Sequence, residues 1–221
     1  MSILDAKEQL HDEHGAVAFQ ENHVGIMMKL GDIPGTFIEP RYAGYHNILG
    51  RPLSGYQGQQ VMGTPELYDA LNKLQTRLSP RGIHLLLYDG YRPQRAVDDL
   101  VHWCSMPEDE KTKAEFYPKI EKSQLISLGY IADKSSHSRG SAVDLSLVLD
   151  GTILDMGTMF DFMDPLSAHH APGITEVQTE NRHRLACCMT EAGFVPYERE
   201  WWHYRLSQEP YPNTYFDEVI Q

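Results

Sequence analysis

The stretch 135-SSHSRGSAVD-144 decides the fold, because a polar loop turns at Gly140 and leads directly into a strand. Apolar side chains alternate over 142–149 and predict one buried face, which places Asp144 on the opposite face. Imidazole nitrogen and carboxylate oxygen are good zinc ligands, so His137 and Asp144 form a candidate pair. Alone the pair is a weak motif, since a surface histidine beside a solvated aspartate is the commoner meaning of such a spacing.

A second stretch, 198-EREWWHY-204, carries a carboxylate and an imidazole amid aromatic residues. His203 can complete a set of three protein ligands with one open position, which is typical of catalytic zinc. Glu200 can take a proton from water at that site and return it to a leaving amine. Side chains three positions apart on a flat strand point to opposite faces, so we expect an irregularity at Trp201 and Trp202. Alone, the segment fits an edge strand with a satisfied histidine equally well.

The remaining sequence alternates helical and strand-like patterns without a βαβ rhythm, which favours an α+β fold. Thr64 and Pro65 are suited to begin a helix, and the turn signal Asp89-Gly90 closes a buried strand. Pro93 then holds Arg92 extended at a strand-to-helix junction. The predicted helices cover 65–78, a segment after Pro93, and 180–192, and the polar stretch 107–122 also has helical character. The predicted strands cover 83–88, 142–149, 194–197 and 201–206.

The bulk properties fit one domain spanning residues 1–221. No apolar run approaches the roughly 20 residues that a membrane helix needs. The net charge of -12 disfavours nucleic acid and anionic membranes, so a small substrate is expected. The first residues, MSILDAKEQLHDEHG, lack the basic patch and apolar stretch of a secretory signal, which predicts a cytoplasmic protein.

Taken together, these segments resemble the VanX-type D-alanyl-D-alanine dipeptidases, a zinc D,D-dipeptidase family. The resemblance covers most of the chain from about Arg41 onward. Several long motifs in one order are far more specific than any one of them. In this chain the motifs are DGYRP (89–93), SSHSRGSAVD (135–144), GTMFDFMD (157–164), SAHHAPGI (167–174), EWWHY (200–204) and EPYPNTYFD (209–217).

The resemblance implies hydrolysis of the dipeptide D-alanyl-D-alanine to two D-alanines. It implies a single α+β domain in which a small antiparallel sheet carries one zinc ion (Zn2+) and helices pack around it. By the family's pattern, His137, Asp144 and His203 are the zinc ligands, and Glu200 is the general base and acid.

The resemblance also assigns three residues to the substrate. Arg92 is implied to stabilise the transition state, Asp161 to hold the free ammonium, and Ser135 to line the pocket. Without the family, Arg92 also fits a structural ion pair with Asp89, and Asp161 fits a capping residue equally well.

Two further features are set aside. His169 and His170 are adjacent and rarely could both reach one ion, and their stretch indicates a loop. Tyr42, Tyr45 and Tyr56 can line a pocket, but tyrosines in a loop-rich region are more often packing residues.

Two rival functions stay open. A D,D- or L,D-carboxypeptidase on the same scaffold would trim longer peptidoglycan peptides in an open cleft. A dipeptidase needs a closed pocket with a counter-ion for the ammonium. Asp161 is therefore the residue that distinguishes a dipeptidase from a carboxypeptidase. A non-catalytic binding domain stabilised by zinc would have no use for Glu200 and Arg92.

Overall fold

The computed structural model describes residues 26–221. The N-terminal segment that predicts a cytoplasmic protein lies outside these residues. Within them, the helices are too short or too polar to cross a membrane. The strands are β1 (Met28–Lys29), β2 (Phe37–Ile38), β3 (Met62–Gly63), β4 (Ile83–Asp89), β5 (Ala142–Leu149), β6 (Thr152–Ile153), β7 (Phe194–Tyr197) and β8 (Glu200–Leu206). The helices are α1 (Pro65–Leu78), α2 (Gln94–Ser105), α3 (Lys113–Phe116) and α4 (Glu176–Glu191).

One sheet organises the described chain, in the order β2-β4-β5-β8-β7 with β6 paired to β5. All its pairs are antiparallel except β2 with β4, so the predicted antiparallel sheet is confirmed with one parallel edge strand. At its centre, β5 is buried on both faces. Asp144 and Ser146, predicted on a polar face, are 2% and 0% exposed. That polar face therefore lines the interior of the molecule.

Helix α1 forms where the sequence predicts it. The Thr64 side chain accepts a hydrogen bond from the Leu67 amide, and Pro65 occupies the first turn, where no intrahelical amide donor is needed. Its buried leucines lie at helical spacing and pack on β4. Helix α4 begins at Glu176, four residues before the predicted start, because Thr175 and Gln178 form a capping box.

Most of the helix expected across 107–122 is absent. Only α3 and a short 3-10 helix, Lys122–Gln124, form there. The Glu108 carboxylate accepts hydrogen bonds from the amides of Asp109 and Glu110, which offers the backbone an alternative to a helix. Pro118 ends α3, since the residue before a proline is driven out of the helical region.

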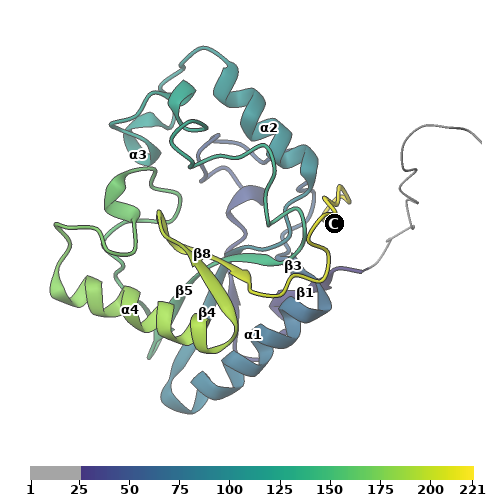
Figure 1. Ribbon diagram of the computed structural model, residues 1–221, viewed down its shortest axis with the longest axis vertical. Coiled ribbons are helices and arrows are strands. Elements are labelled where there is room, and N and C mark those ends of the chain that lie inside the picture. Colours follow the sequence, from purple (N-terminus) through teal and green to yellow (C-terminus); the bar gives the residue numbers. More distant parts are fainter. Residues whose placement is uncertain (1–25) are drawn as a thin grey trace, which may run out of the picture.

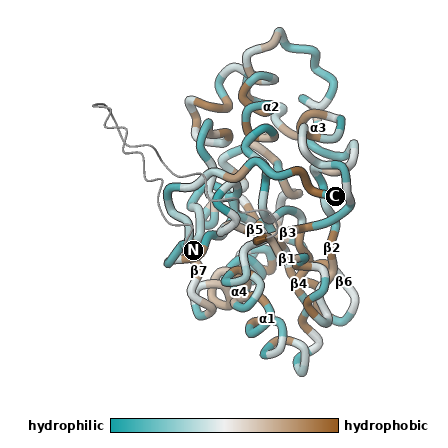
Figure 2. The backbone as a smooth tube through the Cα atoms, turned by 90° about the vertical axis from the view of Figure 1, so that its right-hand side faces the viewer, coloured by the Kyte–Doolittle hydropathy of each residue, from teal (hydrophilic) through white to brown (hydrophobic). Residues whose placement is uncertain are grey.

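The helices lie in two groups, on either side of the middle of the sheet (Figure 1). In Figure 1, α1 and α4 lie along the lower half of the molecule, and α2 and α3 lie in its upper half. Helix α1 contacts β4, and α4 contacts β7 and β8. Hydrophobic segments gather along β4 and β5 in the middle of the molecule (Figure 2). A cavity beside the sheet is lined both by strand residues and by Val97 and Leu100 of α2.

Candidate active site

Three potential metal ligands meet where β5 pairs with β8. The strand register places Asp144 directly opposite His203, and the loop before β5 adds His137. The Asp144 Oδ1 atom lies 3.0 Å from His203 Nδ1 and 3.3 Å from His137 Nε2, and the two ring nitrogens are 3.0 Å apart. All three ligand atoms thus lie within 4.8 Å of one another and can hold one ion.

The surroundings of His137 fix its orientation. Its Nδ1 atom lies 2.6 Å from the Gly90 carbonyl oxygen, to which it can donate a proton, and 3.6 Å from Asp89 Oδ2. Donation to the carbonyl leaves Nε2 free for a metal, which is how ligating histidines are commonly held. The Arg92 amide also donates to the His137 carbonyl at 3.2 Å. The DGYRP turn therefore orients this ligand.

The electrostatics of Asp144 and His203 favour the forms that a metal needs. Burial alone would raise the pKa of the Asp144 carboxyl, but His137 and His203 outweigh burial and lower it. Burial lowers the pKa of His203, although its contact with Asp144 opposes the shift. An ionised carboxylate and a neutral imidazole are the ligand forms that bind zinc.

A bulge in β8 turns Glu200 and His203 toward the same cavity. Glu200 pairs with Tyr197 of β7, but the next pair is Tyr204 with Pro196, so the three β8 residues between them have no partner on β7. The irregularity expected at Trp201 and Trp202 is therefore present. It explains how Glu200 and His203, three positions apart on one strand, can both face the cavity.

Glu200 is a buried carboxyl in this cavity. It is 7% exposed, and burial raises its pKa well above the ordinary value, with the charges of Asp144 and Asp161 adding to the shift. A carboxyl with a raised pKa binds a proton more readily than one in water, which suits a group that accepts and returns a proton. Perturbed groups of this kind are typical of catalytic sites.

Arg92 is fixed by two carboxylates and a ring. Its Nε atom donates to Asp89 Oδ2 at 2.9 Å, and Nη2 donates to Asp144 Oδ2 at 3.3 Å. The guanidinium carbon lies 4.5 Å from the centre of the Tyr42 ring, and Asp89 accepts a further hydrogen bond from the Tyr56 hydroxyl at 2.7 Å. Arg92 therefore forms the ion pair with Asp89 and also lines the cavity, whereas the sequence presents these two roles as alternatives.

Asp161 combines backbone strain with an unsatisfied charge. Its φ of 62° lies in the left-handed region, which costs about 1 to 3 kcal/mol for a residue other than glycine. The side chain is 2% exposed, and its Oδ2 atom has no hydrogen-bond partner in the described structure. Burial raises the pKa of this carboxyl to about 7, although a hydrogen bond from Tyr42 opposes the shift. Such strained, unsatisfied positions mark functional sites.

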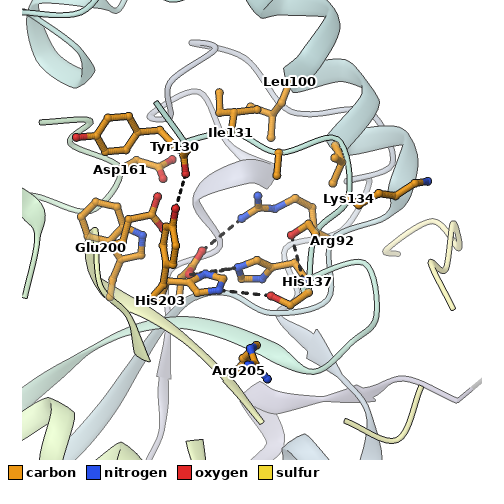
Figure 3. A pocket seen from close by; sticks show the side chains of 18 of the residues that line it. Arg92, Leu100, Tyr130, Ile131, Lys134, His137, Asp161, Glu200, His203 and Arg205 are labelled. Carbon is orange, nitrogen blue, oxygen red and sulfur yellow. Dashed lines mark hydrogen bonds and ion pairs between the residues drawn. The ribbon is translucent and has the colours of Figure 1, made fainter. Parts of the chain in front are cut away.

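One cavity of about 460 Å³ contains every residue that the sequence predicts for the site. In Figure 3 Arg92 and His137 lie on one side of it, and Asp161 and Glu200 lie on the other. Ser135 lines the cavity and accepts a hydrogen bond from the His137 amide at 3.2 Å. The predicted residues at this cavity are Arg92, Ser135, His137, Asp144, Asp161, Glu200 and His203.

Several residues of the site were missed from the sequence. Tyr42 was interpreted as a packing residue, yet it lines the cavity and contacts both Arg92 and Asp161. Tyr130 also lines the cavity and lies near Asp161 in Figure 3, but no motif surrounds it. Asp89 was expected only as part of a turn and as a structural partner of Arg92, yet it also lies 3.6 Å from His137 Nδ1. His169 is not among the cavity residues, in agreement with its exclusion as a ligand.

The arrangement defines a class of protein. Three protein ligands that open onto a cavity leave a position for water or substrate, whereas structural zinc sites are closed by four. A shielded carboxylate and a fixed guanidinium in the same cavity can move a proton and stabilise a developing oxyanion. These features together are those of a metal-dependent hydrolase.

Comparison with known proteins gives the family. A peptidase M15 family model, described as D-ala-D-ala dipeptidase, matches residues 27–221. The D-alanyl-D-alanine dipeptidase of Enterococcus faecium is 47% identical over 84% of this chain and 93% of its own length. Those of Streptomyces coelicolor and Escherichia coli are 43% and 34% identical, over 84% and 79% of this chain and 93% and 81% of their own. The chain therefore belongs to this family of metallopeptidases, as its sequence predicts.

Solved structures show a weaker likeness. VanYB in complex with D-Alanine-D-Alanine has a TM-score of 0.41 and 18% identity, over 69% of this chain and 76% of that one. A mutant of the vancomycin resistance D,D-pentapeptidase VanY in complex with Zn(II) has a TM-score of 0.40 and 18% identity, over 71% of this chain and 78% of that one.

Proposed function

We propose that this protein is a zinc-dependent dipeptidase that hydrolyses D-alanyl-D-alanine to two D-alanines. The observation that carries the proposal is Asp161, a buried carboxylate with an unpaired oxygen in the same cavity as the metal ligands. A free dipeptide has an ammonium close to its scissile bond. This ammonium would supply the positively charged partner that the Asp161 carboxylate lacks among the described residues. The names of the curated relatives agree with this substrate.

His137, Asp144 and His203 would hold the zinc ion. Their atoms fit, since two imidazole nitrogens and one carboxylate oxygen converge within 4.8 Å. Zinc supplies Lewis acidity, which polarises a carbonyl and lowers the pKa of water. Asp89 and the Gly90 carbonyl hold His137 in the orientation that this role requires.

Glu200 moves the proton. As a carboxylate it takes a proton from the attacking water, and as a carboxylic acid it returns that proton to the amine that leaves. Burial raises the pKa of this carboxyl, and a raised pKa favours the protonated form that donates to the leaving amine. Burial beside Trp202 and Asp161 keeps bulk water away from the transfer.

Arg92 stabilises the oxyanion that forms as the peptide carbonyl is attacked. Its fork is held in place by Asp89 and by the face of Tyr42, so little reorganisation is needed during reaction. A preorganised cation gains most when charge develops in front of it, and it therefore favours the transition state over the ground state.

Asp161 and Ser135 set the substrate. Asp161 would pair with the ammonium, and that pairing offsets the loss of hydration when a zwitterion enters a confined pocket. Ser135 lines the same cavity and can donate a hydrogen bond to the dipeptide. A carboxypeptidase acting on longer peptides would place a peptide bond at Asp161, where no cation pairs with the carboxylate.

A binding domain that keeps zinc for structure is the weaker alternative. Such a domain has no need of a carboxyl with a raised pKa or of a guanidinium directed at the metal site. We also propose that the protein acts in the cytoplasm.

The direct experiment is a chromatographic assay of zinc-loaded protein. The substrates are D,D-, L,D-, D,L- and L,L-dialanine and a cell-wall pentapeptide. Preference for D-alanyl-D-alanine supports the proposal. Preference for the pentapeptide assigns the chain to the carboxypeptidase alternative, and no hydrolysis with zinc bound favours the binding domain.

A further inference from the structure

A buried arginine lies outside the proposed reaction. Arg182 belongs to α4, and it is 1% exposed. Among the residues that the structure describes, its hydrogen bonds go to carbonyl oxygens and no carboxylate forms an ion pair with it. Burial lowers the pKa of its guanidinium to about 10. A buried guanidinium without an ion pair is energetically costly. Its hydrogen bonds therefore indicate a structural role for Arg182.

Those hydrogen bonds join the two ends of one segment. Arg182 Nε donates to the Met156 carbonyl at 2.6 Å, and Nη1 donates to the Ala168 carbonyl at 2.6 Å. Residues 156–168, here named the Asp161 segment, run between these two carbonyls. In Figure 1 this part of the chain lies above α4, on the left of the molecule. One planar fork thus fixes the spacing between the ends of the segment.

Neighbouring contacts complete the anchor. Gln178 Nε2 donates to Asp155 Oδ2 at 2.8 Å, and Asn181 Nδ2 donates to the Asp155 carbonyl at 2.9 Å. Within the segment, the Ser167 hydroxyl donates to the Phe162 carbonyl at 2.6 Å. The segment is therefore tied to α4 at its base and to itself beside Asp161.

Asp161 needs such an anchor. A left-handed backbone and a buried, half-satisfied carboxylate both favour a relaxed loop that turns the side chain toward water. We infer that Arg182 is a positioning residue, which keeps Asp161 directed into the cavity by holding both ends of the Asp161 segment in one guanidinium fork. This inference rests on the proposed function, because it gives Asp161 the ammonium of the substrate.

The test compares D-alanyl-D-alanine with N-acetyl-D-alanyl-D-alanine, which has no ammonium. Arg182→Met should lower kcat/KM for the free dipeptide by about tenfold or more, since small misplacements of a positioning group are costly. Hydrolysis of the acetylated dipeptide should change by less than about threefold, because it does not use Asp161. Zinc content should stay the same. Arg182→Lys should fall between wild type and Arg182→Met, since an ammonium cannot copy the fork.

A double-mutant cycle tests whether Arg182 acts through Asp161. If Arg182 acts through Asp161, Arg182→Met should add less than about threefold in the Asp161→Asn background, where the receptor is already lost. If the losses in kcat/KM of the two single variants multiply in the double variant, the inference is contradicted. Circular dichroism and zinc content show whether each variant folds, and if Arg182→Met does not, Arg182→Lys carries the cycle.

Gln75→Met is the matched control. Gln75 is 1% exposed on α1, donates to the Ile83 carbonyl at 3.2 Å and accepts from the Leu85 amide at 2.8 Å, away from the cavity. It should lower stability but leave the ratio of free to acetylated hydrolysis unchanged. A wild type without preference for the free dipeptide contradicts the proposed function and this role with it. A wild type with that preference, whose Arg182 variants weaken both substrates equally, contradicts the role of Arg182 alone.

Discussion

The candidate metal ligands and the Asp161 segment are held in opposite ways. His137, Asp144 and His203 sit on or beside paired strands, and each makes a polar contact with another member of the set. Asp161 lies in an irregular segment with a strained backbone, and one of its carboxylate oxygens has no hydrogen-bond partner among residues 26–221. The candidate metal-binding side chains contact one another, whereas the carboxylate proposed to bind the substrate ammonium keeps an oxygen without a partner among the described residues. The chemistry and the substrate preference can therefore be disrupted separately.

The largest effects should come from the residues that lie on or beside the paired strands. Glu200→Ala should lower turnover by roughly a hundred- to ten-thousand-fold with zinc retained, because proton transfer is lost while the ligands remain. His137→Ala and His203→Ala should lose both activity and zinc. Metal analysis by mass spectrometry beside a turnover assay separates the two outcomes. Loss of zinc from Glu200→Ala would make Glu200 a ligand, and near-normal zinc in both histidine variants would remove the proposed metal site.

Arg92 belongs to the same rigid region, and its effect should be the next largest. Arg92→Ala should lower kcat by about a hundredfold or more and raise KM less, since its contact strengthens as the oxyanion forms. Arg92→Lys should keep part of the activity, because a point charge replaces the fork. Steady-state kinetics on D-alanyl-D-alanine measure both constants. A change in KM alone would move Arg92 to ground-state binding.

The smallest effect concerns the stability of the Asp161 segment. Burial raises the pKa of Asp161 to about 7, so between about pH 4 and 7 the folded protein holds a proton that the unfolded chain has lost. The stability of the metal-free protein should therefore fall as pH rises through this window. Asp161→Asn keeps a residue that tolerates the left-handed backbone and removes the buried charge.

We accordingly expect Asp161→Asn to be more stable than wild type at pH 8, by on the order of one to a few kcal/mol, and close to wild type near pH 4 to 5. Denaturant unfolding of the metal-free proteins across this range measures the difference. A wild type that is the more stable at pH 8 would show that Asp161 is paired in the free protein.

The same contrast explains what the sequence could predict. Helix α1 followed from Thr64, Pro65 and a leucine stripe, and the bulge in β8 followed from the positions of Glu200 and His203, because these signals are local. Each candidate ligand was predicted from its own short motif and from the family resemblance, and the strand register brings Asp144 and His203 together. In each case the deciding information lies within a few residues.

The rest depends on contacts between distant segments. Tyr42 contacts Arg92 and Asp161 only after the chain folds, so no local pattern separates it from a packing tyrosine. The left-handed backbone of Asp161 has no glycine to signal it. The anchor formed by Arg182 joins carbonyls, which carry no sequence information.

The central claim is that Asp161 and the metal site act together on a dipeptide with a free amino terminus. The most direct measurement is kcat/KM for D-alanyl-D-alanine and its N-acetyl form, with wild type and Asp161→Asn, each loaded with zinc. Wild type should prefer the free dipeptide, and Asp161→Asn should lose at least roughly tenfold on that substrate alone with its zinc intact, since truncating one partner of a desolvated charge pair costs about 2 to 5 kcal/mol. Equal cleavage of both substrates by wild type would contradict the account.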